Sequence, residues 1–304
     1  MLDGISIIIP HYNSSELLFK LLETIDLDNS IFEVIIIDDK SNAEEIKKIK
    51  ESKYYPKVIF IENKGKKNAG TCRNIGINTS SRKWMLFADA DDFFIYDLNK
   101  LYEEIKERKE DIIYYIPISC YSDTLELAER HIVYKALLEN YLNLGTKESL
   151  EKLKYNWGTP WSKIIKSEIV KKNNIMYDEC LASNDIMFSM RLAYIARRIG
   201  AENKSFYCIT TRKGSLTNTM SEKIFDAKFE VLKRRNIFLK EIKLEKYANT
   251  GIGFLKISYK YGINKFIKVL IYNISHLTYL KNNIKNYKSF FKILLKKNKY
   301  IIEK

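Results

Sequence analysis

The sequence contains few of the residues from which proteins build zinc sites and disulfide frameworks. Only four cysteines and three histidines occur among 304 residues, and no two cysteines have the C-x-x-C spacing. The cysteines are Cys72, Cys120, Cys180 and Cys208. This scattered arrangement argues against a zinc site and favours free, buried thiols in a reducing compartment.

Long hydrophobic runs are also missing. No uninterrupted apolar stretch reaches the roughly 18 residues that span a bilayer. The first residues, MLDG, carry an acid where a secretory signal has its basic region, so no signal peptide is predicted. With 46% hydrophobic and 30% charged residues, the composition is that of a soluble globular protein, which we expect in the cytoplasm.

Acidic residues are scarce only in the last part of the chain. Residues 221–304 hold 20 basic and 6 acidic residues, which accounts for the whole net charge of +14. Large apolar residues recur there every three or four positions with lysines between them, which predicts basic amphipathic helices. Such helices suit an anionic membrane surface, although helices that pack on the protein itself have the same pattern.

Strand-like and helix-like segments alternate through the first 90 residues. Apolar runs that predict strands covered on both faces lie at residues 5–10, 32–38, 57–63 and 83–89. Helical periodicity occurs between them, at residues 14–25 and 43–52. This order predicts a right-handed, mostly parallel α/β sheet. Because ligands of such sheets bind beyond the carboxyl ends of the strands, the polar residues after each run should converge on one cleft.

Three carboxylates follow the fourth of these runs, in the segment MLFADADDFF. Asp89, Asp91 and Asp92 would repel one another at neutral pH unless a cation lay among them. Hard cations such as Mg²⁺ or Mn²⁺ prefer oxygen ligands. A solvated acidic turn after a strand would have the same composition, so this segment alone leaves both interpretations open.

The segment before the fourth run, residues 63–81, is rich in glycine and asparagine. Its Arg73 offers a planar, forked donor that suits phosphate. The segment contains neither a Walker P-loop nor a G-x-G-x-x-G fingerprint, so by itself it is weak support for a nucleotide site.

Together these segments and two later ones resemble the inverting family-2 glycosyltransferases of the GT-A fold. The shared segments, in the family's order, are IIIPHYN, VIIIDDKS, NAGTCRNIGI, MLFADADDFF, WGTPWSKIIKSEIV and SNDIMFSMRL. The resemblance covers about residues 4–215. It implies an α/β GT-A fold, that is, a Rossmann-like, mostly parallel central sheet flanked by helices, with a C-terminal helical extension. The catalytic domain would comprise residues 1–220, with a nucleotide-sugar half (about 1–95) and an acceptor half (about 96–220), and the extension residues 221–304.

The resemblance implies a metal-dependent inverting glycosyltransferase that transfers a hexose or an N-acetylhexosamine from a nucleotide-diphosphate sugar, with UDP as the expected nucleotide. The acceptor would be a saccharide or lipid-linked saccharide of bacterial capsule, lipooligosaccharide or related glycan synthesis. Mn²⁺ or Mg²⁺ would stabilise the charge that develops on the leaving diphosphate. With the basic extension, this places the protein peripherally on the inner face of the bacterial cytoplasmic membrane.

The resemblance also assigns roles to single residues. Asp91 would be the direct metal ligand of a D-x-D motif that begins at Asp89, with Asp92 beside it. The residues implied in nucleotide binding are Pro10, Tyr12, Asp38, Asp39, Asn68, Arg73, Asn74 and Asp89. Among these, Asp39 matches the acid that binds the uracil ring, and Arg73 and Asn74 match residues near the ribose and diphosphate.

The acceptor side is implied by the last two shared segments. Asp185 would be the general base that takes the proton of the acceptor hydroxyl, with Glu179 as an alternative. Trp157 and Trp161 would form apolar platforms on a loop for sugar faces, and Lys163 would support this wall. Asn184 departs from the family, because it stands where the first acid of an E-D pair is usual.

A second departure concerns the metal site. No histidine occurs between residues 132 and 275, where many relatives supply a further ligand. The resemblance therefore implies that the metal depends on the D-x-D carboxylates and the nucleotide, with weak affinity when no donor is bound. His11, inside the first shared segment, is expected to be a pocket residue.

Two other functions compete with glycosyl transfer. A sugar-1-phosphate nucleotidyltransferase also combines an α/β sheet, a metal and a nucleotide, but would need a glycine-rich loop after the first strand, where this sequence has PHYNSS. A nucleic-acid-binding protein would use the basic segment, but it leaves the clustered carboxylates unexplained.

Overall fold

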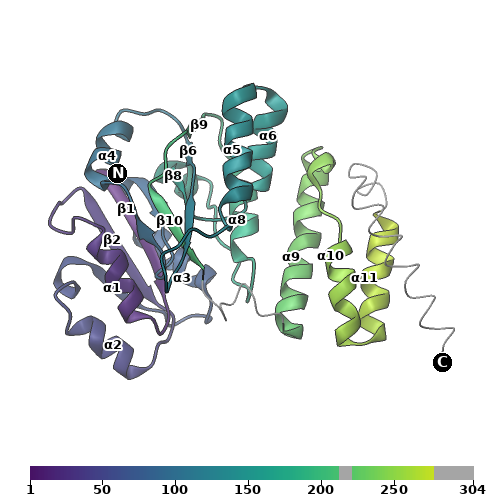
Figure 1. Ribbon diagram of the computed structural model, residues 1–304, viewed down its shortest axis with the longest axis horizontal. Helices are drawn as coiled ribbons and strands as arrows, with labels where there is room; N and C mark the ends of the chain where they lie inside the picture. The colour runs from purple at the N-terminus through teal and green to yellow at the C-terminus, as the bar shows by residue number, and fades with distance from the viewer. Residues whose placement is uncertain (212–220, 277–304) are drawn as a thin grey trace. The chain divides into compact units, whose positions relative to one another are not determined.

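The computed structural model describes residues 1–211 and 221–276. The chain forms two compact units (Figure 1). The first unit comprises Met1–Cys180 and Asn184–Asn218, and the second comprises Leu181–Ser183 and Thr219–Lys304. The predicted amphipathic helices of the basic segment can be compared with the structure only up to residue 276, because residues 277–304 lie outside the described residues.

The first unit is built on a seven-stranded sheet with the order β3-β2-β1-β4-β8-β6-β9. Its strands are β1 (Leu2–His11), β2 (Phe32–Asp38), β3 (Ile59–Glu62), β4 (Arg82–Phe87), β6 (Ile112–Tyr115), β8 (Lys163–Lys166) and β9 (Ile199–Glu202). Strands β1 to β4 pair in parallel, as do β6 and β9, whereas β8 is antiparallel to both of its neighbours. The predicted mostly parallel α/β sheet is therefore confirmed.

Helices cover this sheet (Figure 1). They are α1 (Ser15–Glu23), α2 (Ala43–Lys50), α3 (Ala69–Thr79), α4 (Leu98–Ile105), α5 (Ile132–Leu144), α6 (Lys147–Asn156), α7 (Ser167–Lys172) and α8 (Asn184–Ile195), with a 3₁₀ turn at Tyr55–Lys57. Several begin at a residue whose side chain accepts a hydrogen bond from a first-turn amide, as Asn42 and Asn68 do. Capping thus fixes where the chain leaves a loop and enters a helix.

A smaller sheet of three strands lies in the same unit, with the order β5-β10-β7. These strands are β5 (Phe93–Phe94), β7 (Ile118–Tyr121) and β10 (Tyr207–Thr211). The apolar run at residues 111–119 is divided between β6 and β7, because Pro117 stands between them and cannot donate to a ladder. β5 follows the acidic segment directly, so this sheet connects that segment to a strand more than 100 residues later.

The core of the first unit explains the apolar runs. Ile7, Ile8 and Ile9 in β1 are all completely buried, as expected for a strand covered on both faces. Helix α3 packs against β1 at Gly76, where an added Cβ would lie 2.3 Å from Cγ2 of Ile8. All four cysteines are free, as predicted; three are buried and Cys180 is half-buried.

The second unit is helical where it is described. It contains α9 (Glu222–Glu241), α10 (Ile252–Ser258) and α11 (Ile263–Ser275), with 3₁₀ turns at Glu245–Tyr247 and Tyr259–Tyr261. A separate small core joins them, made by Phe225, Ile252, Leu255, Phe266 and Val269. Within the described residues, no helix combines the length and the hydropathy that crossing a bilayer requires.

Candidate active site

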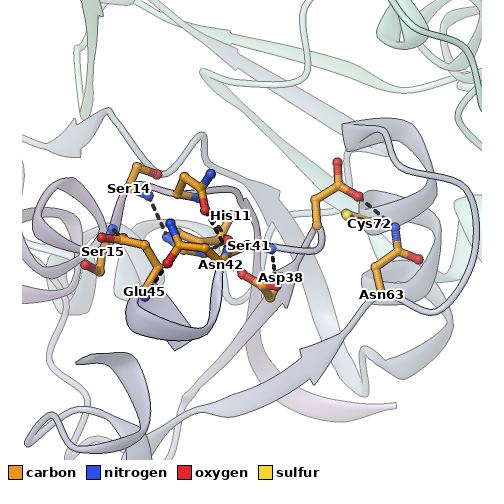
Figure 2. A network of polar contacts seen from close by, with 11 residues as sticks. His11, Ser14, Ser15, Asp38, Ser41, Asn42, Glu45, Asn63 and Cys72 are labelled. Carbon is orange, nitrogen blue, oxygen red and sulfur yellow. Dashed lines mark hydrogen bonds and ion pairs between the residues drawn. The ribbon is translucent and has the colours of Figure 1, made fainter. Parts of the chain in front are cut away.

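The carboxyl ends of β1 and β2 are joined by a buried histidine–aspartate pair (Figure 2). His11 Nδ1 lies 2.9 Å from Asp38 Oδ1, and its Nε2 accepts a hydrogen bond of 3.1 Å from the amide of Ser14. Because Nε2 accepts, neutral His11 must carry its proton on Nδ1 and donate it to Asp38. The pair therefore fixes the first turn after β1 against the end of β2.

Asp38 uses both of its carboxylate oxygens inside the protein. One accepts from His11 and the other accepts from the amide of Ser41, at 2.9 Å. Burial works to raise the pKa of Asp38, but the hydrogen bonds from His11 and Ser41 outweigh it and the pKa is lowered. Asp38 is completely buried, so both of its oxygens are occupied within the protein. This corrects the expectation that it contacts the nucleotide.

Asp39 and Tyr12 follow the ends of β2 and β1, and their predicted contact with the nucleotide stays a prediction. The amide of Asp39 donates to His11 O at 2.7 Å, and its Oδ1 accepts from Asn63 Nδ2 at 2.8 Å. Asn63 also donates to Lys66 O, so it ties the loop after β3 to Asp39. Tyr12 is 47% exposed, with Lys67 Nζ 3.7 Å from its ring centroid. Pro10, two residues before Tyr12, is half-buried at the end of β1.

Arg73 connects the acidic segment to helix α8. One terminal nitrogen lies 2.6 Å from Asp89 Oδ1, and the other donates to Asn184 Oδ1 at 2.9 Å. Burial opposes the charge of Arg73, but Asp89, Tyr177 and Asp185 raise its pKa, so the guanidinium stays charged. Both terminal nitrogens of Arg73 thus bind protein groups, and its expected place near the ribose and diphosphate stays a prediction.

Asn68 and Asn74 also serve the fold at this place. Asn68 caps α3 by accepting from the amide of Thr71 at 2.9 Å. Asn74 accepts from the amide of Tyr177 at 2.8 Å and donates to its carbonyl at 3.0 Å. The side chains of both residues thus bind backbone groups of this region. Their expected contact with a nucleotide stays a prediction.

The three carboxylates after β4 have different surroundings. Asp92 is only 3% exposed; its oxygens accept from Tyr207 Oη at 2.8 Å and from the amide of Thr210 at 2.7 Å. Burial, with the nearby charges of Asp89 and Asp91, raises the pKa of Asp92. Asp92 thus attaches the acidic turn to β10, which corrects its expected place beside the metal.

Asp89 and Asp91 remain as the carboxylates that a divalent ion would use. Both are half-buried, and Asp89 is already paired with Arg73. Among the described residues, no three cysteine, histidine or acidic side chains are grouped closely enough to hold a metal by themselves. Two carboxylates fit a Mg²⁺ or Mn²⁺ site that is completed by phosphate oxygens and water.

Asp185 stands in the first turn of α8, half-buried among charged groups. Burial raises the pKa of its carboxyl; Asp89 adds to this effect, and the positive charges of Arg73 and Lys163 oppose it. A carboxyl whose pKa lies above the usual range is a better proton acceptor, as a general base requires. The alternative base, Glu179, lies 3.8 Å from the ammonium of Lys66.

Lys163 is 1% exposed and donates to Ser189 Oγ of α8 at 3.0 Å. Burial lowers its pKa to about 7, while the charge of Asp185 opposes this shift. Its ammonium is therefore bound to α8, and its expected support of the acceptor wall stays a prediction. Lys163 acts on Asp185 through its charge.

The two tryptophans are core residues. Trp157 and Trp161 are each 1% exposed, and Tyr134 of α5 packs edge-on against both, at centroid distances of 5.1 and 4.8 Å. The Gly-Thr-Pro turn between them folds both rings inward. The expected exposed platforms for sugar faces are therefore corrected.

Sequence reasoning missed the roles of Tyr207 and Thr210. Tyr207 Oη accepts from the amide of Asp89 at 2.9 Å and donates to Asp92, and Thr210 Oγ1 donates to Asp91 O at 2.8 Å. Both residues belong to an ordinary apolar strand, and no local signal in the sequence distinguishes them.

The first unit is an α/β domain with a mostly parallel central sheet flanked by helices. The model of the Glycosyl transferase family 2 matches residues 6–168, and the chain belongs to this family. Family membership confirms the resemblance noted in the sequence.

Curated relatives include three named transferases. Glycosyltransferase GlyA of Streptococcus pneumoniae serotype 4 is 26% identical over 86% of this chain and 38% of its own length. The cholesterol galactosyltransferase of Borreliella burgdorferi is 28% identical, over 71% and 63%. The poly(ribitol-phosphate) beta-N-acetylglucosaminyltransferase TarS of Staphylococcus aureus is 27% identical, over 69% and 36%. The chain thus matches between about a third and just under two thirds of the length of these relatives.

Solved structures support the fold. Residues 1–349 of S. aureus TarS in complex with UDP-GlcNAc superpose with a TM-score of 0.60 at 17% identity, covering 94% of this chain and 81% of that one. The complex of the same protein with UDP gives a TM-score of 0.59 at 19% identity, over 78% and 65%. At this level of identity the likeness shows the shared GT-A fold.

Proposed function

We propose that this protein is a metal-dependent inverting glycosyltransferase that uses a UDP-sugar. It would transfer a hexose or an N-acetylhexosamine to a saccharide or lipid-linked saccharide in bacterial surface-glycan synthesis. The observation that carries the proposal is the bridge made by Arg73 between Asp89 and Asn184. It holds the D-x-D carboxylates close to Asp185, and a transferase needs its diphosphate site and its base within one sugar's reach.

Family membership and the solved structures of TarS with UDP and UDP-GlcNAc favour a UDP-sugar donor. Asp39 would accept a hydrogen bond from the base, and the exposed ring of Tyr12 would lie against it. Tyr12, which is 47% exposed, and Asp39, whose carboxylate also accepts from Asn63, are the residues on which this proposal rests. The same family membership weighs against the nucleotidyltransferase and nucleic-acid alternatives.

Asp91, with Asp89 beside it, would hold the Mn²⁺ or Mg²⁺ ion. A bound divalent ion would supply neutralising charge for the diphosphate as it leaves. Asp185 would take the proton from the acceptor hydroxyl as that oxygen attacks the anomeric carbon. Lys163 and Arg73 favour the ionised form of Asp185, which is the form that can accept this proton.

Calorimetry of UDP binding tests the metal site directly. We expect UDP to bind more tightly with Mn²⁺ than without it, and we expect Asp91→Ala to remove this difference. Asp28→Ala, an exposed acid paired with Lys57, serves as the matched control and should retain the difference. Equal UDP affinity for wild type and Asp91→Ala, with and without Mn²⁺, would remove the metal from the proposal. In a separate assay, the UDP-sugar that the protein hydrolyses slowly without an acceptor would identify the donor.

We also propose that the second unit contacts an anionic membrane surface. Ile263, Ile267, Ile271 and Ile274 of α11 are 44–60% exposed, and their spacing places them on one face of the helix. Residues 221–276 contain 12 basic and 5 acidic residues, so this apolar stripe belongs to a basic unit. An apolar face combined with lysines is the pattern of helices that lie at a membrane interface.

A chain that ends near Asn282 tests the membrane proposal. The removed residues carry seven lysines and one glutamate, and each lysine near an anionic surface contributes about 1 kcal/mol at best. We expect binding to vesicles that contain phosphatidylglycerol to fall, and to weaken further with salt, while donor hydrolysis persists. If the full-length protein ignores such vesicles at low salt, the membrane proposal is wrong.

A further inference from the structure

A basic pocket of about 620 Å³ lies in the first unit, at the end of the sheet opposite to the acidic segment. Its basic side chains are Lys83, Lys166, Lys171, Lys172 and Arg198. Lys83 lies near the start of β4, whereas Asp89 follows the end of that strand. Six residues of strand separate the two positions by about 20 Å, so the pocket is remote from the candidate active site.

Two of these lysines are held in place without being neutralised. Lys83 Nζ donates to the carbonyl of Lys106 at 2.6 Å, and Lys171 Nζ donates to the carbonyl of Ser80. A carbonyl oxygen fixes the position of an ammonium group but carries no full charge. Both lysines therefore contribute their positive charge to the pocket from fixed positions.

Arg198 is the one cation of the pocket with a buried carboxylate partner. Asp111 Oδ1 accepts from its guanidinium at 3.1 Å, and Asp111 Oδ2 accepts from the amides of Arg197 and Arg198, at 2.8 and 2.9 Å. Asp111 is thus fully used by this pairing. The lining then contains four lysines and one further acid, Glu168, so its net charge is positive.

Lys166 experiences this surplus of positive charge. Its ammonium lies 5.5 Å from the ring centroid of Trp84, at the end of β8. Burial lowers the pKa of Lys166, and the charges of Arg198 and Lys83 lower it further against the opposing effects of Asp111 and Glu110. A bound anion would relieve this repulsion among the cations.

We propose that this pocket binds a phosphate group, as a phosphomonoester or a phosphodiester. Lysines bind phosphate as point charges from several directions, whereas planar carboxylates are matched by a free guanidinium fork. One terminal nitrogen of Arg198 is paired with Asp111, so the four lysines supply most of the positive charge of the lining, and this favours the phosphate. The volume lies within the range of small-molecule pockets, so the pocket also has room for the group that the phosphate esterifies. This inference is independent of the transfer reaction.

Titration with inorganic phosphate tests the proposal in the full-length protein, with UDP and Mg²⁺ present at saturation to occupy the active site. We expect saturable binding to the wild type. Lys166→Gln should weaken it at least about tenfold, because one charge-assisted hydrogen bond is lost. Lys172→Gln should also weaken phosphate binding. Because Lys172 is exposed, this variant should fold normally and can test the proposal even if Lys166→Gln unfolds.

The matched control is Lys57→Gln, which removes an equally positive residue that is paired with Asp28 elsewhere on the first unit. It should bind phosphate as the wild type does. The proposal is overturned if wild type shows no saturable phosphate binding, or if Lys57→Gln weakens binding as much as Lys166→Gln does.

A second measurement distinguishes the source of the phosphate. Glycerol phosphate and vesicles of phosphatidylglycerol with phosphatidylcholine are compared for wild type and Lys166→Gln. If only glycerol phosphate binding falls in the variant, the ligand is a soluble or polymeric phosphate ester. If vesicle binding falls as well, the ligand is a lipid headgroup. If neither falls while inorganic phosphate binding also persists, the pocket is not a phosphate site.

Discussion

Strand β8 carries one lysine at each end, and the two lysines have opposite electrostatic surroundings. Lys163 is buried beside Asp185, whose charge favours its protonated form. Lys166 lies near Arg198 and Lys83, whose positive charges disfavour the protonated form of Lys166. The sheet therefore separates an acidic end, where we propose the metal and diphosphate site, from a basic end, where we propose the phosphate site. The same residue type takes a different role because the direction of the strand decides which end it reaches.

The largest expected effect comes from the acidic end. Asp185→Asn should abolish transfer, since general-base catalysis commonly contributes about 10²–10⁴-fold. UDP binding should remain nearly unchanged, because the base acts on the acceptor. Transfer rates and UDP calorimetry measure both effects, and Lys166→Gln at the other end of the sheet should retain transfer. If Asp185→Asn remains active and Glu179→Gln does not, the base has been assigned to the wrong residue.

A second prediction compares the buried carboxylates of the two ends. Burial raises the pKa of Asp111, but the amides of Arg198 and Arg197 and the guanidinium of Arg198 outweigh it, so the pKa is lowered. At Asp92, burial and two acidic neighbours leave the pKa raised. Ionisation of Asp111 therefore stabilises the fold above the unfolded pKa of about 3.9, and this stability is lost as the pH falls through the folded pKa. For Asp92 the sign is opposite: the folded state loses stability as the pH rises from the unfolded pKa of about 3.9 through the raised folded pKa.

At neutral pH without divalent ions, Asp111→Asn should lower the free energy of unfolding by about 1.5–3 kcal/mol, the contribution of hydrogen bonds to a charged group. Asp92→Asn removes an unfavourable buried charge but also one of the two acceptor oxygens that bind Tyr207 and Thr210, so we expect a smaller loss of stability than for Asp111→Asn. Urea unfolding at several pH values measures both variants. Equal losses of stability in the two would contradict the electrostatic difference between the two ends.

The smallest expected effect is a shift in pH dependence. Because the active form of Asp185 is ionised and its pKa is raised, transfer should fall as the pH decreases toward that pKa. Lys163→Met removes a positive charge that favours the ionised form, so this acidic limb should move to higher pH. Lys166→Gln should leave it in place. A pH–rate profile of the three proteins measures the shift, and an unmoved limb in Lys163→Met would mean that Lys163 serves packing alone.

The sequence determined the architecture of the first unit, because strands buried on both faces must be continuous apolar runs such as Ile5–Ile9. It also determined where the site lies, since parallel strands bring their carboxyl ends to one edge. This rule places the acidic turn after β4 at that edge without any knowledge of side-chain contacts. It does not state which side chains of the turn face outward.

Only the tertiary structure decided which residues of the expected site are accessible. Asp92 accepts from Tyr207 across 115 residues of sequence, and Arg73 reaches Asn184 across 111. Trp157 and Trp161 are enclosed by Tyr134 in the same way. Side-chain burial depends on partners that are distant in sequence, and such pairings leave no local periodicity. The charge surplus at Lys166 likewise arises only when β4, β8 and the segment before β9 are brought together in the fold.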